Sequence, residues 1–90
     1  MSGADLGGAD LSDANLSNAN LHWAALYNAD LRRATLKDAN LHYANLSAAN
    51  LDNTFLDDAN LKDALGTTTG QLAKAKSLKD AIMPDGSKHP

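Results

Sequence analysis

Two histidines and three large aromatic residues are the side chains of this sequence best suited to chemistry or binding. They are His22, Trp23, Tyr27, His42 and Tyr43. His22-Trp23 is echoed twenty residues later by His42-Tyr43, so a structure with a twenty-residue period would stack the two pairs. Imidazoles titrate near neutral pH and bind metals, and Trp and Tyr are over-represented in binding sites. We therefore treat these five residues as the candidate interaction patch.

The patch does not predict an enzyme or a metal site. Two histidines without a cysteine or a convergent carboxylate fall short of the usual zinc ligand set, and the chain has no cysteine at all. No nucleophile–base pairing or phosphate loop is present either, so no catalytic residue and no cofactor are predicted. Two interpretations stay open: the rings bind another protein, or they only stack on each other and support the backbone.

Leucine recurs every five residues from Leu6 to Leu61, twelve times in all. Alanine stands two positions earlier in each unit except at Thr54, and Asp or Asn lies between the two in nine units. A helix would scatter these leucines around its axis, and an unbroken strand would alternate them between faces. A chain that turns a corner after each short segment can bury them all, and Asp and Asn suit such corners. The repeat predicts a solenoid.

The twenty-residue echo predicts four units per coil and turns the sequence into a map of the surface. The same register places Asp13 below Arg33 and Arg32 below Asp52, as exposed ion pairs. Asn and Asp residues that stack in this register are expected to form structural ladders, in which amides hydrogen-bond from coil to coil. The ladder residues are Asn20, Asn40 and Asn60, and Asp10, Asp30 and Asn50.

Residues 4–63 resemble the pentapeptide-repeat proteins, whose motif is Ala-(Asp/Asn)-Leu-x-x. The resemblance implies a right-handed, four-sided β-helix in which the residue between Ala and Leu and the following two point outward. Twelve units at four per coil then predict about three coils. The expected fold class is an all-β solenoid, a right-handed quadrilateral β-helix with a short C-terminal α-helix as cap.

The five-residue rhythm stops after residue 66. Thr68 and Gln71 have the spacing of a capping box, which predicts a short helix at about 69–77. The expected organisation is a repeat domain at 1–66, a cap at 67–84 and a mobile tail at 85–90.

The cap sequence carries three further predictions. Leu78 and Met83 are again five apart, so one or two partial units are expected before a Pro84-Asp85-Gly86 turn. Phe55 and Leu65 occupy outward positions where Asp or Asn is usual, and we expect the cap to cover them. The segment from Gln71 through this turn resembles the C-terminal caps of cyanobacterial pentapeptide-repeat proteins.

No cap precedes the first repeat. Ala4, Leu6, Ala9 and Leu11 are therefore expected at an open coil edge, which invites pairing with another chain. This predicts a homodimer through the N-terminal coils, or a domain that originally followed another segment.

The composition argues against two classes of partner, nucleic acids and membranes. A net charge of −3 over 90 residues argues against a nucleic-acid-binding surface, which needs clustered Lys and Arg. No apolar run reaches the ~20 residues of a membrane span, and no leader precedes the repeats. The expected compartment is the cytoplasm, or the periplasm or thylakoid lumen if a leader was removed.

The leading interpretation is a non-catalytic scaffold or interaction module for an unidentified protein partner. A structural spacer in a larger assembly is the alternative. The family resemblance also implies a third, since some pentapeptide-repeat proteins mimic DNA and bind DNA gyrase. The short coil, the net charge of −3 and the basic residues Arg32, Arg33 and Lys37 argue against that mode.

Overall fold

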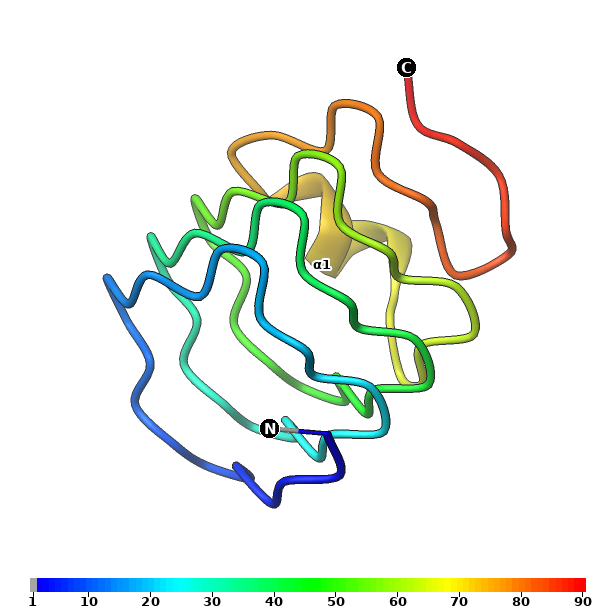
Figure 1. Cartoon of the computed structure of the whole chain (residues 1–90). Helices are drawn as coiled ribbons and strands as arrows, with labels where there is room; N and C mark the ends of the chain where they lie inside the picture. Colours follow the sequence, from blue (N-terminus) through cyan, green and yellow to red (C-terminus); the bar gives the residue numbers. More distant parts are fainter. Residues whose placement is uncertain (1) are drawn as a thin grey trace.

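The repeat winds into a four-sided coil that stacks on itself every twenty residues (Figure 1). The structure, a computed structural model, describes residues 2–90. Parallel β-bridges join residues twenty apart, and each rung is one residue rather than a continuous strand. We name the sides by their rungs. Side A holds Asp5, Ala25, Asn45 and Leu65; side B holds Asp10, Asp30 and Asn50; side C holds Asn15, Thr35, Phe55 and Ser77; side D holds Asn20, Asn40, Asn60 and Ile82.

The corners follow from a left-handed residue two positions after each leucine. Asn28, for example, has φ of 58°, and the Ala29 N–H beyond it donates to the Leu26 carbonyl at 3.0 Å. Gly, Asn and Asp adopt this conformation most readily, and they fill nine of the thirteen corner positions from Gly3 to Asp63.

Asp and Asn at the rung positions act differently. In all nine units that have one, the side-chain oxygen accepts from the backbone N–H two residues later, as Asn20 does from His22 at 3.2 Å. This local bond holds the entry to the corner.

Alanine and leucine fill the interior. From Leu21 to Leu61 every repeat leucine is at most 2% exposed, whereas Leu6, Leu11 and Leu16 of the first coil are only partly buried. The one departure from alanine, Thr54, is fully buried, and its hydroxyl donates to the Leu31 carbonyl at 2.6 Å. A buried hydroxyl is tolerated here because it has a hydrogen-bond partner.

Within residues 2–90 there is one helix, α1 (Thr69–Ala73), which lies over the C-terminal end of side B. Thr68 is its N-cap, and the capping box with Gln71 that the spacing predicted is confirmed. The predicted end at residue 77 was wrong. Beyond Ala73 the backbone returns to the coil, because the Lys74 carbonyl accepts from Asn53 N–H and Lys76 N–H donates to the Thr54 carbonyl.

The coil resumes after the helix, as the Leu78 and Met83 spacing predicted. Ser77 pairs with Phe55 on side C and Ile82 with Asn60 on side D, twenty-two residues apart because the helical detour is longer than one repeat side. The chain therefore forms three coils and part of a fourth, which has rungs on sides A, C and D.

Residues 85–90, expected to form a mobile tail, fold back and hydrogen-bond to the end of the coil. A turn at Pro84–Gly86 reverses the chain, as predicted, and the Gly86 N–H donates to the Met83 carbonyl. Lys88 then pairs antiparallel with Ile82, and His89 N–H donates to the Ala81 carbonyl at 2.8 Å.

The expectation that the cap covers both outward apolar residues was half wrong. Phe55 is partly buried beneath Ser77, and the Lys37 ammonium lies 5.8 Å from its ring centroid. Leu65 is 54% exposed, because the chain leaves side A at Gly66 and later covers only sides B, C and D. No helix within residues 2–90 is long and apolar enough to cross a membrane.

Candidate interaction surface

Four rings stack at the corner between sides D and A. Trp23 lies on Tyr43 with centroids 4.4 Å apart and planes at 13°, and His22 lies on His42 at 5.2 Å and 15°. The histidine pair and the Trp23–Tyr43 pair also contact each other, since the ring centroids of His42 and Tyr43 are 4.2 Å apart. The coil brings these residues together because each pair follows a side D leucine, Leu21 or Leu41.

The stack is most open at its N-terminal end. Trp23 is 57% exposed, and the equivalent position one coil lower is Gly3, which has no side chain to cover the indole. Tyr43 and both histidines are partly buried. Above them, Asp63 Oδ2 lies 3.5 Å from His42 Nε2, close enough to pair with a protonated imidazole.

The backbone under the rings is unusual for such residues. Trp23 and Tyr43 occupy left-handed corner positions, with φ of 65° and 62°, where most other corners carry Gly, Asn or Asp. Bulky side chains are uncommon in this region, and conformations of this kind gather at functional sites. The sequence thus places its only Trp where a smaller residue would fold more easily.

The described residues contain no group of three or more His, Asp or Glu side chains arranged to hold a metal ion. Two hollows beside the cap are open to solvent. One lies between α1 and the edge of side B, and the other between α1 and the Pro84 turn. The ring stack lines neither of them.

Comparison with known proteins accounts for the four-sided coil. The pentapeptide repeat profile matches residues 1–33 and 29–65, with eight copies of the motif. This chain belongs to the pentapeptide repeat family. No curated protein matches it.

Three solved pentapeptide repeat proteins are similar to this chain. HetL of the cyanobacterium Nostoc sp. strain PCC 7120, involved in heterocyst differentiation regulation, is 34% identical over 96% of this chain and 47% of its own, with a TM-score of 0.45. A protein of the Arabidopsis thaliana thylakoid lumen is 28% identical over 76% of this chain and 57% of its own, with a TM-score of 0.38. A second Nostoc PCC 7120 protein is 26% identical over 91% and 62%, with a TM-score of 0.26. The present chain thus spans about half the length of HetL.

Tyr27 lies apart from the other predicted patch residues. Its ring packs over Gly7 one coil below, where a Cβ would collide with the ring atoms, and 41% of the residue is exposed. Among the described residues, no ring contact joins Tyr27 to the four stacked rings. It sits at the next corner, after Leu26, and one side of the pentapeptide coil separates the two corners. The candidate surface therefore consists of His22, Trp23, His42 and Tyr43.

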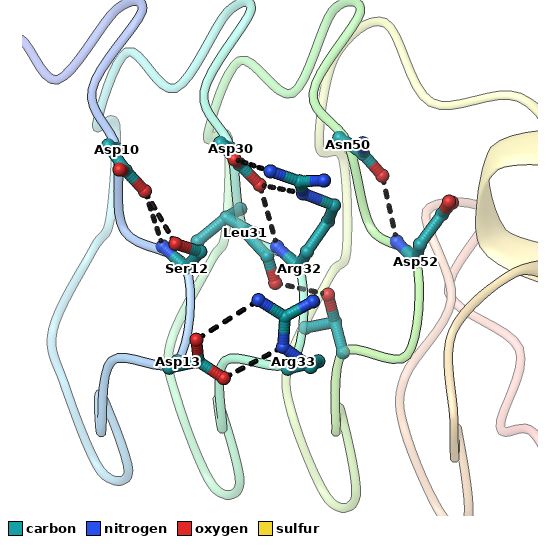
Figure 2. Close-up of polar contacts among 10 residues, drawn as sticks. Asp10, Ser12, Asp13, Asp30, Leu31, Arg32, Arg33, Asn50 and Asp52 are labelled. Carbon is teal, nitrogen blue, oxygen red and sulfur yellow. Dashed lines mark hydrogen bonds and ion pairs between the residues drawn. The ribbon is translucent and has the colours of Figure 1, made fainter.

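The two predicted ladders exist in the backbone. Asn20 pairs with Asn40 and Asn40 with Asn60 on side D, and the side B ladder is built in the same way. Their side chains do not hydrogen-bond across the coils, however. Each oxygen bonds within its own turn, as Asp10, Asp30 and Asn50 do in Figure 2. These ladders serve the structure of the pentapeptide coil.

A charged cluster lies at the corner between sides B and C (Figure 2). The Arg33 guanidinium donates two bonds to Asp13 one coil below, at 2.9 and 3.1 Å, as the register predicted. Arg32 pairs with Asp30 of its own turn at 2.8 Å, and not with Asp52. The carboxylate two residues earlier already bonds the Arg32 N–H, so it lies closer than the coil above.

These contacts lower three carboxyl pKa values. The Arg33 side chain lowers the pKa of Asp13, and the Arg32 side chain, followed by its backbone N–H, lowers that of Asp30. The Ser12 hydroxyl and then its N–H lower the pKa of Asp10. Both guanidinium groups already face carboxylates, so this cluster is a structural feature of the corner.

Proposed function

We propose that this right-handed pentapeptide coil is a non-catalytic protein-interaction module, and that the ring stack of His22, Trp23, His42 and Tyr43 is its binding surface. The observation that carries the proposal is the stacked Trp23–Tyr43 pair, whose outer ring is 57% exposed. The non-catalytic part draws support from the interior, where alanine and leucine side chains occupy the space that a substrate would need.

The stack suits recognition of another protein for two reasons. Stacked rings are held in place before binding, so little conformational entropy is lost when a partner covers them. Trp and Tyr also bury large apolar areas while keeping an N–H or O–H for a hydrogen bond. The best partner is a protein with an apolar patch bordered by hydrogen-bond acceptors.

A structural spacer is the competing function, since stacked rings can also stabilise neighbouring coils. The two functions predict different effects of replacing Trp23 and Tyr43 by Asn, the residue found at corners 18, 28 and 53. If the rings serve binding, the Asn variant keeps or gains stability, because Asn accepts the left-handed backbone more readily. If the rings support the coil, stability falls by about 1 kcal/mol or more, the typical value of an aromatic pair.

The test compares proteins captured from a lysate by wild type and by the Trp23→Asn/Tyr43→Asn variant, quantified by mass spectrometry. Tyr27→Ala is the matched control, because it removes an exposed ring outside the stack. The expected result is a protein retained by wild type and the control and lost by the double variant. Binding to the purified candidate is then followed by Trp23 fluorescence, which reports from within the proposed interface. Equal capture by all three proteins would overturn the interaction function and favour the spacer.

The role in heterocyst differentiation regulation belongs to HetL, of which this chain spans 47%. We propose only the mode of action, protein binding without catalysis, and leave the process to the identity of the captured partner.

A further inference from the structure

The first coil presents unpaired backbone groups on all four sides. In the coils above it, each rung residue directs both its N–H and its C=O toward the N-terminal end. Ala25 N–H donates to the Ala4 carbonyl, and the Ala25 carbonyl accepts from Leu6 N–H, both at 2.8 Å. The corresponding groups of the first coil make no hydrogen bond within residues 2–90; they belong to Asp5, Asp10, Asn15 and Asn20.

The interior next to this edge is apolar, and two of the outer corners carry glycine. Leu6, Leu11 and Leu16 form a partly exposed floor, unlike the buried leucines of later coils. At two of the edge's four corners, Gly3 and Gly8 carry no side chains that would keep another backbone away, and the other two corners carry Asp13 and Asn18. A second coil can therefore approach to the spacing of a β-ladder.

We propose that the N-terminal coil of a second copy occupies this edge, stacked head to head about a twofold axis. Two coils related in this way run antiparallel on every side. A residue that directs both N–H and C=O to one side is what an antiparallel hydrogen-bonded pair requires, because its two members exchange both bonds. The rungs of the edge are thus self-complementary, as an isologous interface must be, whereas the corner carbonyls of Gly7, Ser12 and Ser17 also face outward and find no donor in this pairing.

The pitch of the coil selects one register. The chain climbs about 4.8 Å per coil, so sides A, B, C and D begin at levels about 1.2 Å apart. The distance between the two edges is the same on all four sides only if the lowest side of one copy faces the highest side of the other. Side A then lies opposite side D of the second copy, and side B opposite side C.

The charges favour the same register. It pairs Asp5 with Asn20 of the second copy and Asp10 with Asn15, so no rung carboxylate faces another. The axis also passes the corner between sides B and C, where Asp13 meets Asp13 of the second copy, but each of these carboxylates already pairs with Arg33. A twofold axis through sides A and C would instead place Asp5 on Asp5, and no Lys or Arg precedes Arg32 to offset the repulsion.

Sedimentation equilibrium tests the association itself. A molecular mass that rises with concentration from 9.4 kDa toward twice that value supports the proposal. Because the interface is a single coil end, we expect the transition at micromolar or higher concentration. A mass that stays at 9.4 kDa up to about 1 mM would overturn it.

Cysteine cross-linking tests the register, and the cysteine-free chain makes a clean background. Asp5→Cys/Asn20→Cys brings cysteines opposite each other, with Cα atoms about 5.5 Å apart, within disulfide range. Asp5→Cys/Asn15→Cys is the matched control, since these positions do not meet. Mild oxidation should give a covalent dimer of the first variant alone. Equal cross-linking of both, or of the control only, would overturn the register.

A charge change provides an independent readout. Asn15→Asp/Asn20→Asp keeps the turn bonds, because Asp5 and Asp10 already make them, but it sets carboxylates against each other on every side. We expect dimerisation to weaken about tenfold or more and to recover in high salt. Asn28→Asp/Asn53→Asp adds the same charge away from the edge and should leave dimerisation unchanged. Equal weakening in both variants would show that the edge is not the interface.

Discussion

The two ends of this coil carry the same kind of rung but finish in opposite ways. In the first coil, Leu6, Leu11 and Leu16 are partly exposed, and the N–H and C=O groups of its four rung residues make no hydrogen bond within residues 2–90. At the C-terminal end a helix, two further rungs and an antiparallel tail lie over the last full coil. The difference shows that a pentapeptide repeat defines its cross-section but not its ends, which depend on residues outside the repeat.

Gln71 illustrates how the closed end works. Its Nε2 donates to the Leu46 and Ala49 carbonyls, both at 2.8 Å, while its Oε1 accepts from Thr68 N–H at 3.1 Å. One side chain thus supplies donors to coil carbonyls and caps the helix that covers them. Nothing equivalent protects the described part of the N-terminal edge, where the rung donors and acceptors and the corner carbonyls make no hydrogen bond.

The largest contrast is expected from leucine truncation in the middle and at the open end. Leu36→Ala removes a fully buried side chain and should lower the free energy of unfolding by about 2–5 kcal/mol. Leu11→Ala should cost about 1 kcal/mol, because that side chain is already partly in water. Urea unfolding of both variants measures the difference. Equal losses would mean that the first coil is covered in solution, as in the proposed dimer at high concentration.

The next largest loss of stability is expected from a substitution at Gly66, where the chain leaves side A. It has φ of +74°, and a Cβ there would lie 2.7 Å from the Ser47 Cα. Gly66→Ala should therefore cost about 1–3 kcal/mol. Gly70→Ala is the control, since it lies in α1 with open space around it and should stabilise by about 0.5–1 kcal/mol. Thermal unfolding compares the two, and a harmless Gly66→Ala would show that the exit from the coil can relax.

A smaller change should follow from Gln71→Glu. The new side chain can still accept from Thr68 N–H, but it cannot donate to the Leu46 and Ala49 carbonyls. We expect a loss of about 1–2 kcal/mol. Hydrogen exchange should accelerate in residues 69–82 and stay unchanged in the first two coils. Uniform acceleration along the chain would show that the cap and the coil unfold as one unit.

The smallest effect is expected at the charged corner. The pKa of Asp13 is lowered by Arg33, so this pair stabilises the fold above the ordinary Asp value of about 3.9 and ceases to do so as the pH falls below it. The Tm difference between wild type and Arg33→Gln should therefore be small at pH 7 and shrink as the pH falls below about 3.9. A difference that does not shrink on acidification would assign the effect to packing of the Arg33 stem.

The sequence was sufficient for much of the fold because the repeat is redundant. The spacing of twelve leucines predicted the coil and its four sides, and Thr68 and Gln71 predicted the helix start. Leu65 and Arg32 were misjudged for a shared reason. The twenty-residue register predicts which residues lie above one another. It does not predict that the chain leaves side A after Leu65, or that Arg32 has a nearer partner in its own turn.

The candidate surface was also predicted only in part. The register correctly stacked Trp23 on Tyr43 and His22 on His42. Tyr27 was expected around the next corner of the same edge, and its ring makes no contact with the four stacked rings among the described residues. That its ring rests on Gly7 could have been found from the twenty-residue spacing, which places the largest side chain of that corner over the smallest.

By itself, the sequence determined the cross-section of this protein, since a five-residue period with paired Ala and Leu can be buried in a four-sided coil and not in a straight helix or strand. The tertiary structure decided how the coil ends. The length of α1, the return of the tail onto Ile82 and the free rungs at the N-terminal end depend on which backbone groups still lack a partner after the repeats have stacked. These free groups can be identified only in three dimensions, because coil groups find their partners about twenty residues away and the tail pairs only once the chain has turned back, Lys88 with Ile82.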